Sequence, residues 1–216
     1  HQAMPDKAPA EGTSCLWNPA LMGGHGLVPD AEFGDATPFA VGLFHTGGTG
    51  ARPLKDGLSA TAFPSGVRNT PVEINESIAP IIVWRKDYRM DSGGAGEFRG
   101  GTGQIMEIAS SENAPFAIAA AFDRVHHAPR GREGGLDGFT GRVELTSGEI
   151  LRNKGTQTIP RGDRLHLEMP GGGGYGNPLK RDAEQVAMDV RNGMVSAAAA
   201  LEHYGVVLDD QGVVDV

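Results

Sequence analysis

The segment Arg89–Gly103 constrains the fold of this chain more than any other stretch, because six of its residues are glycine. Glycine tolerates positive φ and lets the backbone approach another group closely, but it loses more conformational entropy on folding than any other residue. The segment joins two apolar stretches, Ile81–Tyr88 and Gln104–Ile108, that have the character of strands. We therefore predict a shaped loop that brings the main chain close to a ligand or to another backbone.

Composition places the chain among turn-rich β proteins. Glycine and proline contribute 33 and 14 of the 216 residues, yet apolar stretches alternate with them throughout. The formal charge of −8 and the lack of a Lys/Arg-rich tract argue against nucleic acid and membrane surfaces as partners. No apolar run is long enough to span a membrane. The single cysteine, Cys15, excludes an internal disulfide and favours a cytoplasmic location.

Period-two alternation and short apolar runs predict a series of β-strands. The strands are expected over Phe39–Phe44, Val72–Glu76, Ile81–Tyr88, Gln104–Ile108, Phe116–Phe122 and Leu165–Met169, with a hairpin formed by Val143–Leu145 and Ile150–Leu151. Along Phe116–Phe122 large side chains alternate with alanine, which indicates that a second layer packs closely on one face.

Only the C-terminal end has clear helical signals. Asn177 followed by Pro178 starts one predicted helix, which Gly193 ends, and Ser196 caps a second, which runs to Tyr204. The predicted fold is therefore mainly antiparallel β with glycine-rich loops and a short C-terminal helical pair, α+β overall. We expect a β-rich domain over residues 1–176 and a helical segment over 177–216 that packs on it.

Two glycine-rich motifs resemble nucleotide sites only superficially. Gly171–Gly176 satisfies the pattern G-x-G-x-x-G, but no second strand follows to complete a dinucleotide-binding unit, so a tight strand-to-helix turn is favoured. The Asp91–Gly103 loop lacks the Gly-Lys-Ser/Thr ending of a phosphate-binding loop. Its N–H groups could form an anion nest beside Arg89 or Arg99, or its glycines could brace neighbouring loops. Both interpretations remain open.

A second group of ionisable residues follows the Phe116–Phe122 strand. Adjacent His126 and His127 suggest a metal, but neighbouring side chains on an extended segment point to opposite faces, so we assign no metal ligand in this chain. Arg99, Arg124 and backbone N–H groups are proposed to contact an anion or oxygen, with Asp123 orienting an arginine. No catalytic residue is assigned. The candidates for a substrate or subunit interface are Asp91, Ser92, Gly93, Gly94, Arg99, Asp123, Arg124 and His126.

Several segments in sequence order resemble the hydantoinase B/oxoprolinase family, and in particular N-methylhydantoinase B-type subunits. The resemblance runs from about Pro5 to Leu208, and this stretch is similar to only the C-terminal portion of a B-type chain. The segments that carry it are Asn69–Glu76, Trp84–Lys86, Arg89–Gly103, Asp123–Arg124, Arg130–Arg132, Lys154–Pro160, Pro170–Asn177, Asp189–Ser196 and Tyr204–Leu208.

The resemblance implies the C-terminal part of an enzyme that opens a cyclic amide (hydantoin, 5-oxoproline or lactam) with ATP. It implies a hydantoinase A-type subunit that binds ATP and Mg²⁺, and a divalent metal in the N-terminal remainder of the B-type subunit, with no cofactor in this chain. Related carboxylases act on acetone or acetophenone. The alternative is a non-catalytic β scaffold or interaction module. Glycine loops that face an open cleft favour direct participation, whereas loops sealed inside the fold favour the scaffold.

Overall fold

The fold is built around two four-stranded antiparallel sheets. The computed structural model describes residues 3–13, 16–26, 36–61, 69–209 and 211–215, so Cys15 lies outside the described residues. The first sheet has the order β5 (Ile81–Tyr88), β6 (Gln104–Ser110), β10 (Leu165–Glu168), β8 (Arg142–Leu145). The second has the order β3 (Phe39–Gly42), β2 (Ala20–Gly23), β7 (Phe116–Ala121), β9 (Lys154–Ile159), and β1 (Leu16–Trp17) pairs with β4 (His45–Thr46).

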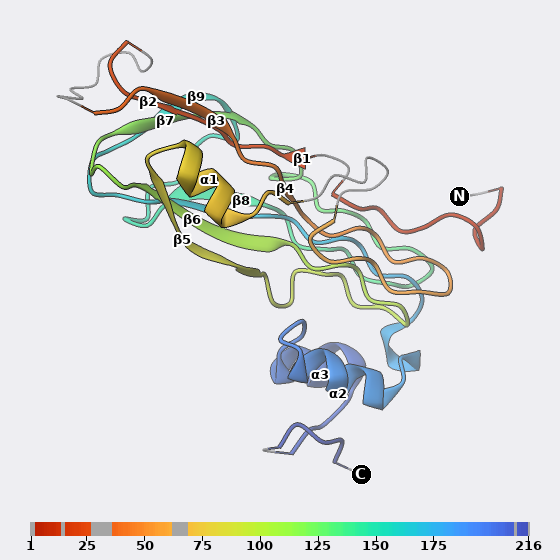
Figure 1. Cartoon of the computed structure of the whole chain (residues 1–216). Helices are drawn as coiled ribbons and strands as arrows, with labels where there is room; N and C mark the ends of the chain where they lie inside the picture. Colours follow the sequence, from red (N-terminus) through yellow and green to blue (C-terminus); the bar gives the residue numbers. More distant parts are fainter. Residues whose placement is uncertain (1–2, 14–15, 27–35, 62–68, 210, 216) are drawn as a thin grey trace.

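The two sheets form a sandwich with one hydrophobic core between them (Figure 1). Alternation places Leu165 and Leu167 of β10 inside, while His166 and Glu168 lie on the more accessible face. From the other sheet, Phe116 and Ile118 of β7 enter the same core. At one end the Trp17 and Phe122 rings stack with centroids 4.4 Å apart, and Trp17 Nε1 donates to the Asp123 carbonyl.

Most predicted strands are confirmed, including Ile81–Tyr88 and the hairpin, in which Leu151 N donates to Val143 O. The prediction for Val72–Glu76 is wrong, because α1 (Val72–Ile78) forms there. Its apolar residues Ile74 and Ile78 are 50% and 64% exposed, so the alternation did not mark a buried strand face. A five-residue pattern is too short to separate helix from strand. β9 was not predicted from its pattern.

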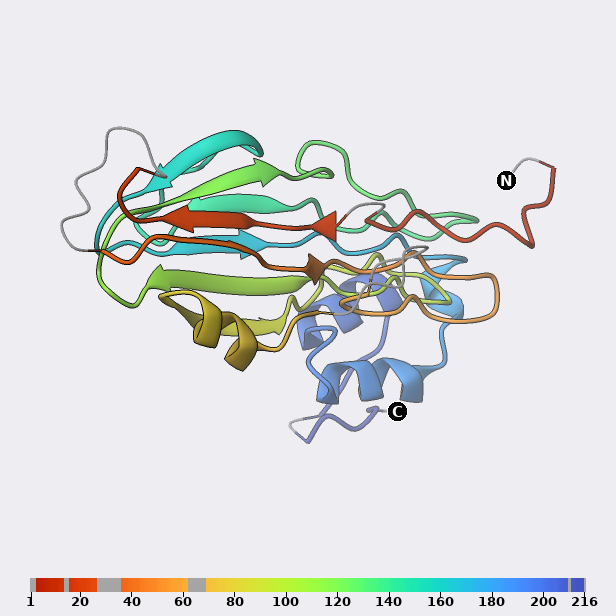
Figure 2. The same ribbon diagram turned by 45° about the horizontal axis from the view of Figure 1, so that its top comes forward.

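Glycine-rich segments leave the sandwich at one end and run beside one another in extended form (Figures 1 and 2). We call segments 10–13, 47–51, 92–103, 129–139 and 170–176 the glycine bundle. Gly172 donates to Gly101 O and accepts from Gly94 N, at 2.9 and 2.8 Å. Gly173 N donates to Glu11 O, and Gly174 N donates to Leu136 O. The 170–176 segment is therefore hydrogen-bonded to several neighbours at once, and it is not the tight turn that was predicted.

Close packing explains why these positions are glycine. A Cβ on Gly172 would lie 1.9 Å from Thr49 O, and one on Gly100 would lie 2.0 Å from Gly172 O. Positive φ is not the reason, because the one residue of Arg89–Gly103 with positive φ is Asp91, at 61°. The expected close approach is thus made to other backbones of the same chain.

The helical pair begins later than the sequence suggested. Asn177 caps only a short 3₁₀ turn, η1 (Pro178–Lys180), while α2 (Ala183–Arg191) takes Asp182 as its N-cap. The predicted Ser196 cap of α3 (Ala197–Tyr204) is confirmed. In the described part of the chain, no helix combines the length and apolar character needed to cross a membrane.

A buried ionic network fastens these helices to the glycine bundle. The Arg99 guanidinium donates to both Asp189 carboxylate oxygens at 3.1 Å, and Arg181 donates to Asp189 and Asp56 at 2.7–2.8 Å. Burial opposes these charges, yet hydrogen bonds donated by Arg181 lower the pKa of the Asp56 carboxyl, and hydrogen bonding to Asp56 raises the pKa of Arg181. Ala95 of the bundle packs beside Val186 and Ala200. Arg99, Arg181 and Asp189 are therefore buried together, and the partly exposed Asp56 completes the network.

Gly172→Ala should lower the free energy of unfolding by about 3 kcal/mol or more, because the added methyl group meets main-chain atoms that cannot turn aside. Urea unfolding measures the loss. The control is Gly42→Ala, whose Cβ would lie 3.3 Å from the Asn18 side chain and no closer to any other atom. It should change stability by less than about 1 kcal/mol. Equal effects of the two substitutions would contradict the packing argument.

Asp189→Asn should cost about 3–5 kcal/mol, because it leaves the buried Arg99 and Arg181 with one carboxylate between them. If residues 177–216 form a separate unit, limited proteolysis should release the helices before it cuts the sandwich. Asp182→Asn makes the same chemical change at an exposed cap where asparagine serves equally well. Proteolysis of that control should follow the parent chain, and simultaneous cutting throughout Asp189→Asn would show a single cooperative unit.

Candidate functional site

Three predicted residues, Asp91, Gly93 and Gly94, line a groove of about 290 Å³ between the glycine bundle and α3. Asp91 connects its two walls. Its carboxylate accepts a hydrogen bond from Ser196 N at 2.7 Å, and its own N–H donates to Met194 O at 3.0 Å. Asp91 therefore joins the loop to the start of α3.

Ser92 is buried and closes the loop on itself. Its Oγ donates to Arg89 O at 2.6 Å and accepts from Gly103 N at 2.9 Å. Only 1% of the residue is exposed. A hydroxyl bound to two main-chain groups has no neighbouring base to activate it, so the geometry assigns Ser92 to the shape of the loop.

The N–H groups that an anion nest would need are used inside the fold. Gly94 N donates to Gly172 O, Gly100 N to Gly94 O, and Gly101 N to Thr49 O. These donors face neighbouring backbones rather than a cavity. At these positions the structure supports the bracing interpretation of the glycine loop over the anion nest.

Neither arginine of the loop is free to hold a ligand. Arg99 is 6% exposed and is committed to Asp189 and Gly100 O. Arg89 donates to Thr140 O at 2.6 Å and pairs with Glu168 at 2.8 Å. Both guanidinium groups therefore connect parts of the fold.

The second group of candidates lies apart from the lining of the groove. Asp123 was expected to orient an arginine, and in the structure its exposed carboxylate binds Lys154 Nζ at 2.6 Å. Arg124 instead binds Glu11 at 3.0 Å, and His126 is exposed.

Glu11 binds Arg124 together with two further arginines. Arg124, Arg130 and Arg132 all bind its carboxylate, at 2.7–3.2 Å. Although burial works in the opposite direction, the arginine hydrogen bonds lower the pKa of Glu11 to about 2. Three guanidinium groups on one carboxylate hold the N-terminal segment against the 129–139 segment. Sequence reasoning missed this role because Glu11 lies more than a hundred residues from its partners.

The groove also contains residues that sequence reasoning did not select. Leu136 and Phe139 are 42% and 55% exposed, and Asp137 and Glu202 add carboxylates beside Asp91. Leu136 and Phe139 stand out in the sequence as apolar residues within a glycine-rich stretch, which could have indicated a contact surface. Nothing in the sequence placed them beside α3. An acidic and apolar lining suits a basic or apolar protein surface better than it suits a phosphate.

Tyr204 forms the inner wall of the groove. It is 6% exposed, and burial raises its pKa to about 12, so the phenol stays protonated at neutral pH. Among the described side chains, no group of three or more His, Cys, Asp or Glu residues is placed to hold a metal ion.

Comparison with known proteins gives one family. Residues 1–178 match the family described as Hydantoinase B/oxoprolinase. The chain is 34% identical over 179 residues to a protein named as the B-type subunit of a D-/L-hydantoinase from Pseudomonas sp. (strain NS671), covering 78% of this chain and 29% of that protein. It is 35% identical over 185 residues to the beta subunit of caprolactamase from Pseudomonas jessenii, covering 78% and 31%.

A solved structure supports the same assignment. The crystal structure of ATP-dependent caprolactamase from Pseudomonas jessenii matches 99% of this chain and 38% of its own, with a TM-score of 0.78 and 28% identity. The chain thus spans about a third of the length of these relatives. With the family match over most of its length, the chain belongs to the hydantoinase B/oxoprolinase family.

Proposed function

We propose that this chain acts as the C-terminal part of a B-type subunit in the ATP-dependent hydrolytic opening of a cyclic amide, such as a hydantoin, 5-oxoproline or a lactam. The observation that carries the proposal is the similarity to ATP-dependent caprolactamase over 99% of the chain. The names of the relatives, a hydantoinase subunit and a caprolactamase subunit, point to ring amides as substrates.

Within such a complex, we propose that this segment is a rigid scaffold and docking surface. Its glycine loops are sealed by backbone packing, and Arg99 and Ser92 serve the fold. Within the glycine loop, Asp91, Gly93 and Gly94 line a groove that a partner can reach. Asp123, Arg124 and His126 remain candidates for the interface rather than for chemistry.

In this proposal, the groups that bind ATP and the metal lie outside this chain. ATP and Mg²⁺ belong to an A-type subunit, and a divalent metal belongs to the N-terminal portion of the B-type subunit. Transfer of the terminal phosphoryl group of ATP to the amide oxygen, with release of ADP, would make the ring carbon a better electrophile. Water would then attack that carbon, the C–N bond would break with the protonated amine as leaving group, and phosphate would be released. The whole assembly is proposed to work in the cytoplasm, and this chain alone need not be active.

The activity test combines this chain with an A-type subunit and the remaining portion of a B-type subunit. Ring opening of caprolactam, hydantoin and 5-oxoproline is followed by product formation and phosphate release. We expect opening of one of these rings that needs ATP and this chain, without added bicarbonate. Product formation that depends on bicarbonate and on acetone or acetophenone would instead identify a carboxylase. Unchanged activity without this chain would contradict the proposal.

The groove should be tested as the docking surface with Phe139→Ala. Loss of a half-exposed aromatic residue from an interface should weaken association with the other subunits by about tenfold. Ile150→Ala is the control, because Ile150 is an apolar residue, 70% exposed, in the β8 hairpin and outside the groove. Analytical ultracentrifugation of the mixed subunits gives the affinity. Equal affinities for the two variants would exclude the groove from the interface.

A further inference from the structure

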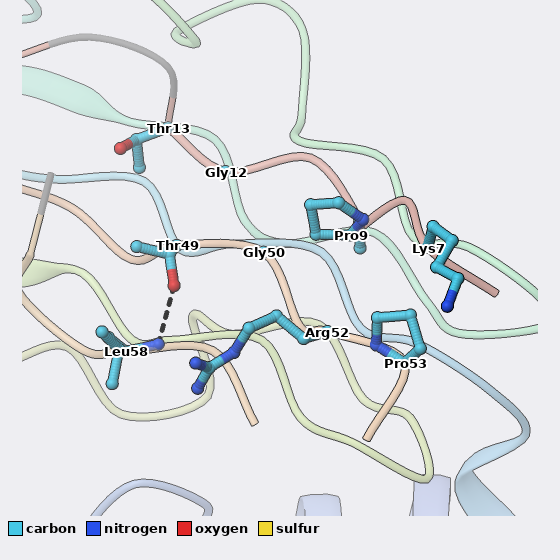
Figure 3. Close-up of a pocket in the computed structure, with 10 residues that line it drawn as sticks. Lys7, Pro9, Gly12, Thr13, Thr49, Gly50, Arg52, Pro53 and Leu58 are labelled. Atoms are coloured by element: carbon cyan, nitrogen blue, oxygen red, sulfur yellow. Dashed lines mark hydrogen bonds between the residues drawn. The ribbon is translucent and has the colours of Figure 1, made fainter. Parts of the chain in front are cut away.

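A second cavity in the glycine bundle is lined by none of the residues that the sequence selected. It has a volume of about 490 Å³ and is bordered by the N-terminal segment 7–13 on one side and by the turn 49–58 on the other (Figure 3). Cavities of roughly 300–1,000 Å³ with a mostly apolar lining and a few polar groups are the usual sites for small organic ligands.

The cavity is lined by two cations and no carboxylate. Lys7 and Arg52 both border it, and neither pairs with a carboxylate among the described residues. Arg52 donates one N–H to Asp56 O at 2.6 Å. A guanidinium has five N–H groups, so most of its donors remain for a ligand.

Among the carboxylates near these segments in sequence, Asp6 is exposed beside Lys7 and lies outside the lining, and the other two are bound to arginines elsewhere. Glu11 holds Arg124, Arg130 and Arg132, and Asp56 holds Arg181. The carboxylates of Glu11 and Asp56 therefore bind other arginines and not the cations of this cavity. The positive lining of this cavity contrasts with the formal charge of −8 of the whole chain.

The rest of the lining is apolar and held in place. Hydrocarbon surface comes from Pro9, Ala10, Pro53 and Leu58. Leu58 is 51% exposed. Thr49 fixes the turn twice, since its N–H donates to Leu58 O at 2.9 Å and its Oγ1 accepts from Leu58 N at 2.7 Å. Ala10 N donates to Ala51 O, which joins the two sides. The walls are thus set before any ligand arrives.

We propose that this cavity binds a small organic carboxylate, with the carboxylate at Arg52 and an apolar body against Pro9, Pro53 and Leu58. Arginine matches the planar carboxylate with two parallel N–H donors, which a neutral amide does not use as well. The prolines and the leucine favour a hydrocarbon chain or ring over a second polar group. Binding would be a property of this chain alone, so it can be tested independently of the proposed enzymatic activity.

The test is an NMR titration of the isotope-labelled 216-residue chain with hexanoate and with hexanamide, which has the same shape without the charge. Hexanoate should shift the amides of Gly12, Thr13 and Gly50, and hexanamide should bind at least about tenfold more weakly. Arg52→Gln and Leu58→Ser should each raise the Kd for hexanoate about five- to tenfold. Far-UV and near-UV circular dichroism confirm that both variants keep the parent fold.

The matched control is Lys55→Gln, which removes a cation from the same exposed turn but outside the lining. Its Kd for hexanoate should stay within about twofold of the parent value. The proposal is overturned by equal binding of hexanoate and hexanamide, by equal effects of Lys55→Gln and Arg52→Gln, or by shifts confined to other parts of the chain. Absence of binding at tens of millimolar hexanoate would overturn it as well.

Discussion

The structure depends on close contact between main-chain segments of the glycine bundle, with no side chain between them. At the centre of the glycine bundle, Gly172 and Gly173 are hydrogen-bonded to segments that come from the N-terminal part of the chain and from its middle. A single methyl group at Gly172 would overlap Thr49 O. Because these contacts are specific in distance and direction, they fix the order of the segments as firmly as the strand register fixes the sandwich.

The functional surfaces follow from that arrangement. The bundle gives Arg99 a fixed position, and the buried pairing of Arg99 and Arg181 with Asp189 holds α2 and α3 beside it. The acidic groove at Asp91 exists only because α3 is held there. Elsewhere the same segments leave a cavity with the two cations Lys7 and Arg52. One backbone scaffold therefore presents two surfaces of opposite charge, which suits different partners.

Family membership and geometry lead to complementary conclusions. The family match places the chain in the hydantoinase B/oxoprolinase family, while the sealed glycine loop and the engaged arginines favour the proposed scaffold role. A scaffold of this kind has to be rigid, because small displacements of catalytic groups cost large factors in rate. Interlocked main-chain hydrogen bonds between glycine segments supply that rigidity with little side-chain volume.

The sequence by itself determined the alternation of β5, β6, β7 and β10, the capping of α3 by Ser196, and the family to which the chain belongs. These are local or compositional properties, readable from neighbouring residues. It did not determine that Val72–Ile78 is helical, since a short alternating pattern fits both states. Only the tertiary structure decided what the glycines of Arg89–Gly103 approach, that Asp123 binds Lys154, and that Phe139 lines the groove beside α3. Each of these depends on a contact between distant parts of the chain, and no local pattern records such a contact.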